Sequence, residues 1–161
     1  MKSVRRSHRV PGPVPVQGGK GMEKLEESPR KVFVMGCAGA ANVGQLSHRA
    51  AAELAGEGFA RPFCLAGIGA HIKGFLKGAS DADNIVIDGC AMACGRTILE
   101  HAGLSVACHL VVTDLGIEKR MNPLLSDEDV AKVKEAVRSR LASGEAGKSA
   151  PPEGPSCGCS S

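Results

Sequence analysis

Four short runs of apolar residues alternate along the chain with longer segments in which apolar residues recur at helical spacing. The third run, residues 85–87, consists only of β-branched residues, which is typical of a strand buried on both faces. Glycine-containing turns follow the runs and separate them from the helical segments. The pattern therefore predicts four strands, at residues 31–35, 61–65, 85–87 and 108–112.

The segments between and after these strands are predicted to form helices that each bury one face. Leu46, Ala50 and Leu54, for example, share a face of the first helix. Asn42 and Ser126 precede the first and the last helix and are expected to cap them. The predicted helices are residues 43–55, a short helix around 72–76, residues 91–101 and a last helix that follows residue 126.

A strand followed by a helix, repeated four times, predicts an α/β fold. Parallel neighbouring strands need crossover connections, and the crossover helices cover both faces of the sheet. We expect a single domain over residues 30–142, with a mostly parallel four-stranded sheet and flanking helices. A chain of 161 residues has room for one such domain and its tails.

The two ends of the chain differ from this domain in composition. Residues 1–29 are basic and rich in Pro and Gly, with too little apolar periodicity to bury, so we predict a disordered tail. Residues 143–161 are rich in Gly, Ala, Ser and Pro and predict a flexible tail. This second tail ends in Cys157-Gly158-Cys159, a dithiol that either captures metal, takes part in redox chemistry or has no function.

Charge and composition narrow the classes of partner. The net charge of +3 comes from the N-terminal tail, since residues 1–30 hold seven Lys/Arg and three Asp/Glu, while the predicted domain is neutral. Four Phe with no Trp or Tyr argue against stacking on nucleic acid. The N-terminus has no continuous apolar segment of the kind that a signal peptide or a membrane span needs. We therefore expect a cytoplasmic protein without a nucleic-acid or membrane partner, in which clustered cysteines bind metal or react.

Four cysteines are expected to converge at one edge of the sheet. Cys37, Cys64 and Cys90 each stand at or near the carboxyl end of a different predicted strand, and Cys94 follows Cys90 by about one helical turn. In a parallel sheet all carboxyl ends share the edge where ligands bind. Cys108 begins its strand, so we expect it at the opposite edge.

Four thiolates at one edge favour a metal site over four small buried hydrophobes. Tetrathiolate coordination is typical of structural zinc and also of iron–sulfur clusters. Zinc is the first choice because the predicted domain contains no Cys-x-x-Cys run. The predicted ligands are Cys37, Cys64, Cys90 and Cys94, and the metal ion is the one partner that the sequence indicates.

The same turn has a rival interpretation. Cys90, five residues and then Arg96-Thr97, after a strand and before a helix, has the spacing of the phosphate loop in cysteine-dependent phosphatases and arsenate reductases. Cys90 would be the nucleophile and Arg96 the anion clamp. Against this hypothesis, no general acid is evident and no glycine lies between Cys90 and Cys94. No catalytic residue or reaction follows from the sequence.

Polar residues near the cysteines are weaker candidates. A carboxylate beside a thiolate site must find a donor, which makes Asp88 a candidate for supporting the ligands. His71, after Gly67-Ile68-Gly69, is a candidate ligand, although a loop histidine is more often only surface. The histidines to which the sequence assigns no role are His48, His101 and His109.

With these residues in place, the segment from about 32 to 120 resembles the DGC-domain family, whose members are described as zinc-binding proteins with four cysteines. The resemblance implies metal binding but no reaction. Family members often carry a second cysteine in the first loop, where this chain has Ala40. The motifs that carry the resemblance are Cys37, Gly44-Gln45-Leu46, Cys64-Leu65-Ala66-Gly67-Ile68-Gly69, Asp88-Gly89-Cys90 with Cys94, Leu99-Glu100-His101-Ala102-Gly103 and Thr113-Asp114-Leu115-Gly116.

Overall fold

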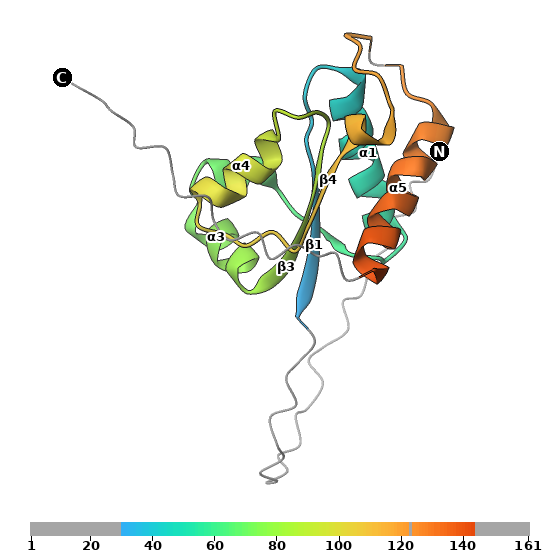
Figure 1. Ribbon diagram of the computed structural model, residues 1–161. Helices are drawn as coiled ribbons and strands as arrows, with labels where there is room; N and C mark the ends of the chain where they lie inside the picture. The colour runs from blue at the N-terminus through green and yellow to red at the C-terminus, as the bar shows by residue number, and fades with distance from the viewer. Residues whose placement is uncertain (1–29, 123, 144–161) are drawn as a thin grey trace, which may run out of the picture.

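The computed structural model describes residues 30–122 and 124–143. It contains a sheet of four parallel strands in the order β2-β1-β3-β4, with β1 and β3 in the middle (Figure 1). The strands are β1 (Lys31–Gly36), β2 (Arg61–Pro62), β3 (Ala82–Asp88) and β4 (Cys108–Val111). The predicted α/β fold with a four-stranded parallel sheet is therefore confirmed.

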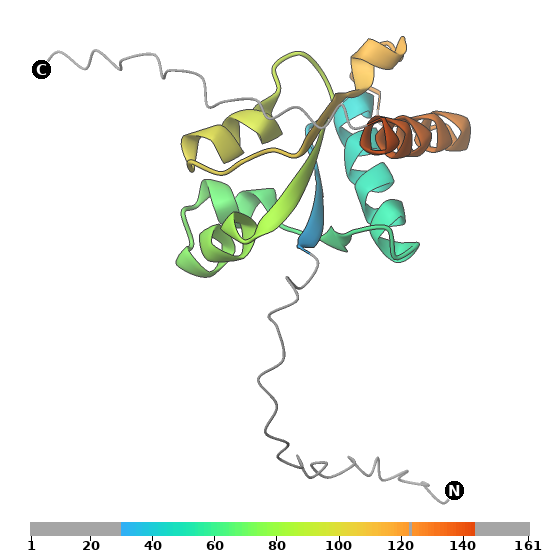
Figure 2. The ribbon, with the colours of Figure 1, turned by 60° about the horizontal axis from the view of Figure 1, so that its bottom comes forward.

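Helices cover both faces of this sheet, so that the molecule has three layers (Figure 2). One face packs on α1 and α5 through a cluster that includes Leu46, Leu54, Ile85 and Val133. The other face packs on α2, α3 and α4. The helices are α1 (Asn42–Gly56), α2 (Leu65–Gly69), α3 (Lys73–Ser80), α4 (Cys94–His101) and α5 (Asp127–Ala142), with the 3-10 turn η1 (Val112–Leu115) after β4.

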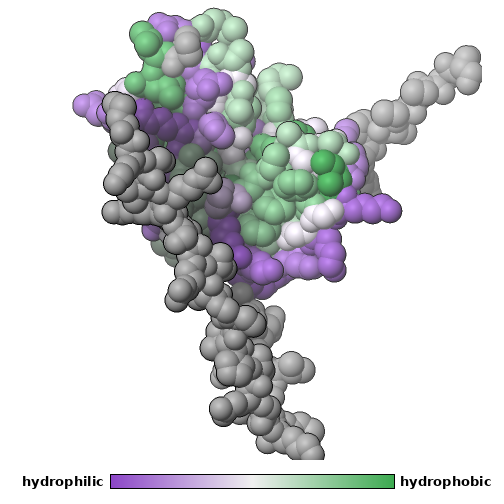
Figure 3. Space-filling view, turned by 180° about the vertical axis from the view of Figure 1, so that it is seen from behind, coloured by the Kyte–Doolittle hydropathy of each residue, from purple (hydrophilic) through white to green (hydrophobic). Residues whose placement is uncertain are grey.

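β3 is the most deeply buried strand, because Ile85, Val86 and Ile87 alternate between the two clusters and are fully buried. The cluster on the second face also contains Met35 and Leu99. Burial of a large aliphatic side chain contributes about 1.5–3 kcal/mol, so these central strands supply much of the stability. The space-filling view shows apolar surface over the half of the molecule that α2, α3 and α4 form (Figure 3).

Several predicted boundaries were wrong in detail. The second strand is shorter than predicted, because it ends at Pro62, and helix α2 (Leu65–Gly69), which was not predicted, follows it. The third helix begins at Cys94 instead of at residue 91. Ser126 precedes α5 as predicted, but its side chain makes no capping hydrogen bond.

Asn42 does not cap α1 but ties it to a distant segment. It is the first residue of the helix, and Ala41 occupies the capping position. The Asn42 side chain accepts a hydrogen bond from the Arg120 N–H at 2.7 Å and donates to the Glu118 carbonyl at 3.0 Å. A tertiary contact has thus replaced the local cap that the sequence suggested.

The predictions about residues 1–29 and about the dithiol Cys157 and Cys159 lie outside the described residues. None of the helices in the part of the chain that the structure describes has the length and hydrophobicity needed to span a lipid bilayer.

Two glycines allow the loops after β1 and β3 to lie close against the first turn of α1. A Cβ added at Gly44, in the first turn of α1, would lie 2.7 Å from the Gly39 amide nitrogen. A Cβ added at Gly89, just after β3, would lie 2.8 Å from the Gly44 nitrogen. Real Cβ atoms do not approach backbone atoms so closely, so each of these contacts between a loop and α1 requires glycine.

Replacing Gly44 with alanine is therefore expected to lower the free energy of unfolding by about 1–3 kcal/mol, as overpacking of a tight contact does. Gly56→Ala is the matched control, since Gly56 lies in the same helix and a Cβ there meets nothing within 4 Å. Urea unfolding of both variants measures the difference. Equal stability of the two variants would contradict the close contact of Gly44 with the backbone of Gly39.

Candidate metal centre

The carboxyl ends of β1 and β3 form the crevice in which the candidate site lies. The chain leaves β1 to form α1 on one face of the sheet and leaves β3 to form α4 on the other face (Figures 1 and 2). Neighbouring parallel strands that diverge in this way leave a crevice where α/β proteins bind ligands. The Cys37 N–H donates to the Ile87 carbonyl at 2.9 Å and so extends the pairing of β1 with β3 to the start of the loop.

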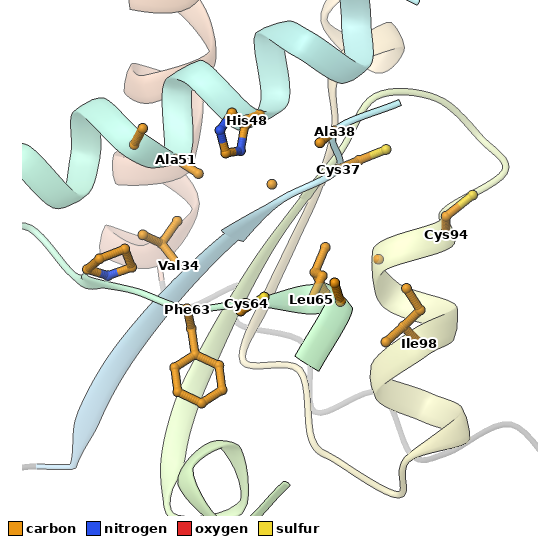
Figure 4. A pocket seen from close by; sticks show the side chains of 15 residues that line it. Val34, Cys37, Ala38, His48, Ala51, Phe63, Cys64, Leu65, Cys94 and Ile98 are labelled. Atoms are coloured by element: carbon orange, nitrogen blue, oxygen red, sulfur yellow. The ribbon is translucent and has the colours of Figure 1, made fainter. Parts of the chain in front are cut away.

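A cavity of about 570 Å³ opens beside this crevice, between α1, β1, α2 and α4. Most of its wall is apolar and includes Val34, Phe63, Leu65 and Ile98 (Figure 4). Four side chains in the same wall can bind a metal ion, and each comes from a different helix or loop. These are the thiols of Cys37, Cys64 and Cys94 and the imidazole of His48.

The local structure around each thiol explains its position. Cys37 directly follows β1 and is partly buried under its own loop, where a Cβ added at Gly39 would lie 3.5 Å from the Cys37 Sγ. Cys64 is the N-cap of α2, and its exposed Sγ accepts a hydrogen bond from the Gly67 N–H at 3.4 Å. Cys94 is the exposed first residue of α4. Three of the four predicted ligands, from segments that are distant in sequence, thus line one cavity.

Cys90 lies apart from these three. It does not line the cavity but packs against the cluster on the α1 and α5 face. Its Sγ accepts a hydrogen bond from the Lys119 Nζ at 3.5 Å. The expectation that Cys94 follows Cys90 by one helical turn was wrong, because Cys90 belongs to the turn that precedes α4.

Asp88 causes this late start of the helix. Its carboxylate, 1% exposed, accepts hydrogen bonds from the Gly95 N–H at 2.7 Å and from the Arg96 N–H at 3.0 Å. These are amides of the first turn of α4, so a side chain at the end of β3 caps the helix from a distance. Ala93, just before the helix, adopts a left-handed conformation with φ of 46°.

A third donor completes the surroundings of Asp88. The His109 Nε2 lies 2.9 Å from the Asp88 Oδ2. Burial raises the pKa of Asp88, but hydrogen bonds from His109, Arg96 and Gly95 outweigh burial and hold the pKa below its usual range. The proposal that Asp88 needs a donor was sound, whereas His109 was missed because only the pairing of β3 with β4 brings it near.

This geometry does not favour the phosphate loop. The Asp88 carboxylate already accepts from two amides at the start of α4, where a bound oxyanion would have to sit. Arg96, the candidate anion clamp, instead pairs with Glu100 through its Nε at 2.5 Å. A second anion at this turn would be repelled by the buried carboxylate.

The other candidates take no part in the cavity. His71 is exposed, has a φ of 54° and does not line it. Cys108 begins β4 and is 2% exposed, and it pairs with Ile85 in the middle of β3 and not with the amino end of that strand, where it was expected. Burial raises the pKa of the Cys108 thiol, although Arg140 partly opposes this effect. Within residues 30–122 and 124–143, no three His, Cys, Asp or Glu side chains stand close enough together to hold a metal ion without moving.

Comparison with known proteins decides the family. The model of the DGC domain matches residues 33–137, which is more than half of the chain. The chain belongs to the DGC-domain family. The resemblance carried by the cysteine motifs is thus confirmed, and all four cysteines that the sequence suggests as ligands lie inside the matched region.

This DGC-domain protein is also similar to the anaerobic and virulence modulator AnvM of Pseudomonas aeruginosa. The two are 26% identical over 102 residues, which cover 63% of this chain and 78% of AnvM. No solved structure matches the chain.

Removing the charge of Asp88 tests whether this carboxylate caps the N-terminus of α4. Asp88→Asn offers one acceptor oxygen where the structure needs acceptors for three donors, so the free energy of unfolding should fall by about 3 kcal/mol. Asp114→Asn, an exposed acidic residue of η1, is the control and should change stability by less than about 0.5 kcal/mol. Chemical unfolding measures both, and similar losses in the two variants would contradict the role of Asp88.

Proposed function

We propose that this protein binds one soft divalent metal ion, zinc first, through cysteine thiolates at the carboxyl edge of the sheet. The observation that carries the proposal is the placement of Cys37, Cys64 and Cys94 on the wall of one cavity. Each comes from a different part of the chain, so local sequence spacing does not explain their meeting. The thiol of Cys90, on the neighbouring loop, is the fourth predicted ligand.

The donor set fits zinc. Thiolates and imidazole are the ligands of structural zinc sites, and oxygen-seeking cations such as Mg²⁺ or Ca²⁺ prefer carboxylates that this wall lacks among the described residues. An iron–sulfur cluster remains the second choice, because it uses the same thiolates. A zinc ion held here would supply a cross-link between the loop after β1, the start of α2 and the start of α4.

Metal binding would close the site. The thiols of Cys64 and Cys94 are exposed, and the described ligands do not yet surround one point. Bringing them together requires side-chain rotation and small loop shifts, which the binding free energy would drive. Metal binding should therefore stabilise the fold.

The role of the metal is structural, metal-handling or redox-sensing. Exposed thiolates are open to exchange and to oxidation, which favours the latter two roles over a purely structural one. The relative AnvM is named as an anaerobic modulator, and this name supports a sensing role for the present chain within the proposal. Cys157 and Cys159 are proposed to exchange metal or electrons with this site.

Two serine variants test the metal site. Cys94→Ser should lose most of the metal and destabilise the protein, because structural metal binding is folding free energy. Cys108→Ser changes a buried thiol that does not line the cavity, so this variant should keep about one metal per chain and cost only about 1–2 kcal/mol for the altered packing. Elemental analysis of protein purified without oxygen, combined with thermal unfolding, measures both effects. Wild-type protein that is free of metal under these conditions, or equal metal loss in both variants, would overturn the proposal.

A further inference from the structure

A cation lies against the thiol of Cys90, the predicted ligand that stands apart from the cavity. The Lys119 Nζ donates a hydrogen bond to the Cys90 Sγ at 3.5 Å. Cys90 is partly buried, whereas Lys119 is exposed on the loop after η1. The thiol of Cys64, in contrast, accepts its hydrogen bond from a neutral backbone N–H. In the described part of the chain, Cys90 is therefore the cysteine that has a charged donor.

Lys119 is not engaged by a carboxylate among the described residues. Its neighbour Arg120 pairs with Glu118, with 2.8 Å between the Arg120 Nη2 and the Glu118 Oε2. The charge of Arg120 is thus matched within the loop, while the charge of Lys119 is directed to the thiol.

The loop that carries Lys119 is tied to the first turn of α1. The Asn42 N–H donates to the Arg120 carbonyl at 3.0 Å. The Asn42 side chain accepts from the Arg120 N–H and donates to the Glu118 carbonyl. These three hydrogen bonds act on the two residues that flank Lys119 in the sequence. In Figure 1 this orange segment lies beside the start of α1, so the position of Lys119 is set by the fold.

The loop that carries Cys90 rests on the same turn of α1. A Cβ added at Gly89, directly before Cys90, would lie 2.8 Å from the Gly44 nitrogen. Asn42 and Gly44 both belong to the first turn of α1. One helical turn therefore holds the thiol and the ammonium group on either side of their hydrogen bond.

A site of four thiolates needs a compensating charge. Zinc with four thiolates carries a net charge of −2, and the described residues that line the cavity beside the other three thiols include no Lys or Arg. A hydrogen bond from an ammonium group to a thiolate is charge-assisted and stronger than one between neutral groups. The flexible four-carbon chain of Lys119 lets its ammonium group follow the Cys90 sulfur when the ligands close around the metal.

We infer that Lys119 is a positioning residue of the metal site, which stabilises the Cys90 thiolate as a ligand and lowers its reactivity. The inference rests on the proposed function and deepens it, because it gives the four thiolates different chemistry. A thiolate that is stabilised by a cation is a weaker nucleophile. The exposed thiolates of Cys64 and Cys94 are then the ones that react first with an electrophile.

Cobalt(II) tests the effect on the ligand, because the sulfur-to-cobalt charge-transfer band reports the energy of the sulfur electrons. Lys119→Met removes the ammonium group, so the band should move to longer wavelength while its intensity stays nearly constant. Cobalt binding should weaken about 10-fold, the lower end of the range for loss of a group that supports a metal ligand, because Lys119 is exposed. Lys119→Arg keeps a cationic donor and should restore the wild-type band.

Iodoacetamide tests the effect on reactivity, because a thiolate displaces iodide and mass spectrometry locates the new thioether. In the full chain loaded with excess zinc, Cys90 should react last of the four predicted ligands. Lys119→Met should raise the rate at Cys90 about threefold relative to the rate at Cys64. Loss of metal alone would raise the rates at all four cysteines, so this ratio isolates the effect of Lys119.

Two further variants serve as controls. Lys31→Met removes an exposed lysine at the amino end of β1 and should behave as the wild type does. Asn42→Ala releases the loop that carries Lys119 and should move the band in the same direction as Lys119→Met. In the double variant the two effects should not add, because both act through one hydrogen bond.

The outcomes separate this inference from the proposed function. A wild-type protein without any sulfur-to-cobalt band would overturn the proposed function, and the inference with it. A wild type with the band, but with Lys119→Met equal to Lys31→Met in band position, affinity and Cys90 reactivity, would overturn the inference alone. A shifted band and faster reaction at Cys90 in Lys119→Met, both reversed in Lys119→Arg, support the inference and the proposed function.

Discussion

The hydrogen bonds of the buried Asp88 carboxylate hold the candidate site in shape. This one side chain ends β3, caps α4 through the amides of Gly95 and Arg96, and accepts from His109 on β4. Because the cap comes from the strand and not from the residue before the helix, α4 begins at Cys94 and presents that thiol to the cavity. The carboxylate also occupies the amides that an anion-binding loop would use, and the arrangement therefore suits a cation at this edge more than an oxyanion.

Close backbone packing supplies the second constraint. The first turn of α1 touches the loop after β1 at Gly44 and the loop after β3 at Gly89, and α1 touches the end of β1 at Gly36. These contacts fix the distance between the layers at the edge where the cysteines lie. They also explain why residues from α1 and from the loop after β1 reach the same cavity as residues of α2 and α4. The carboxyl edge of the sheet, with its exposed thiols, is therefore a suitable place to bind a metal ion, and the loops that carry the thiols would close around the ion.

The sequence was sufficient for the fold and for most of the cavity, because both follow from pattern. Buried strands such as 85–87 and helices with a regular apolar face are local signals, and parallel strands necessarily bring Cys37 and Cys64 to one edge. Tertiary contacts decided the rest. Asn42, expected to cap α1, instead forms a hydrogen bond with the Glu118 carbonyl. The N-terminus of α4 is capped by Asp88, which lies on β3 and not directly before the helix. The contact of His109 with Asp88 and the position of His48 depend on strand order and helix packing, which no local spacing contains.

The central claim is that thiolates from three distant segments bind one metal ion at the carboxyl edge of the sheet. X-ray absorption at the zinc edge of the zinc-loaded protein tests this claim most directly, because it reports the identity and distance of the ligand atoms. The account predicts a first shell of four sulfur atoms at about 2.3 Å from the zinc ion. A first shell that contains only nitrogen and oxygen atoms would show that the cysteines do not hold the metal and would contradict the account.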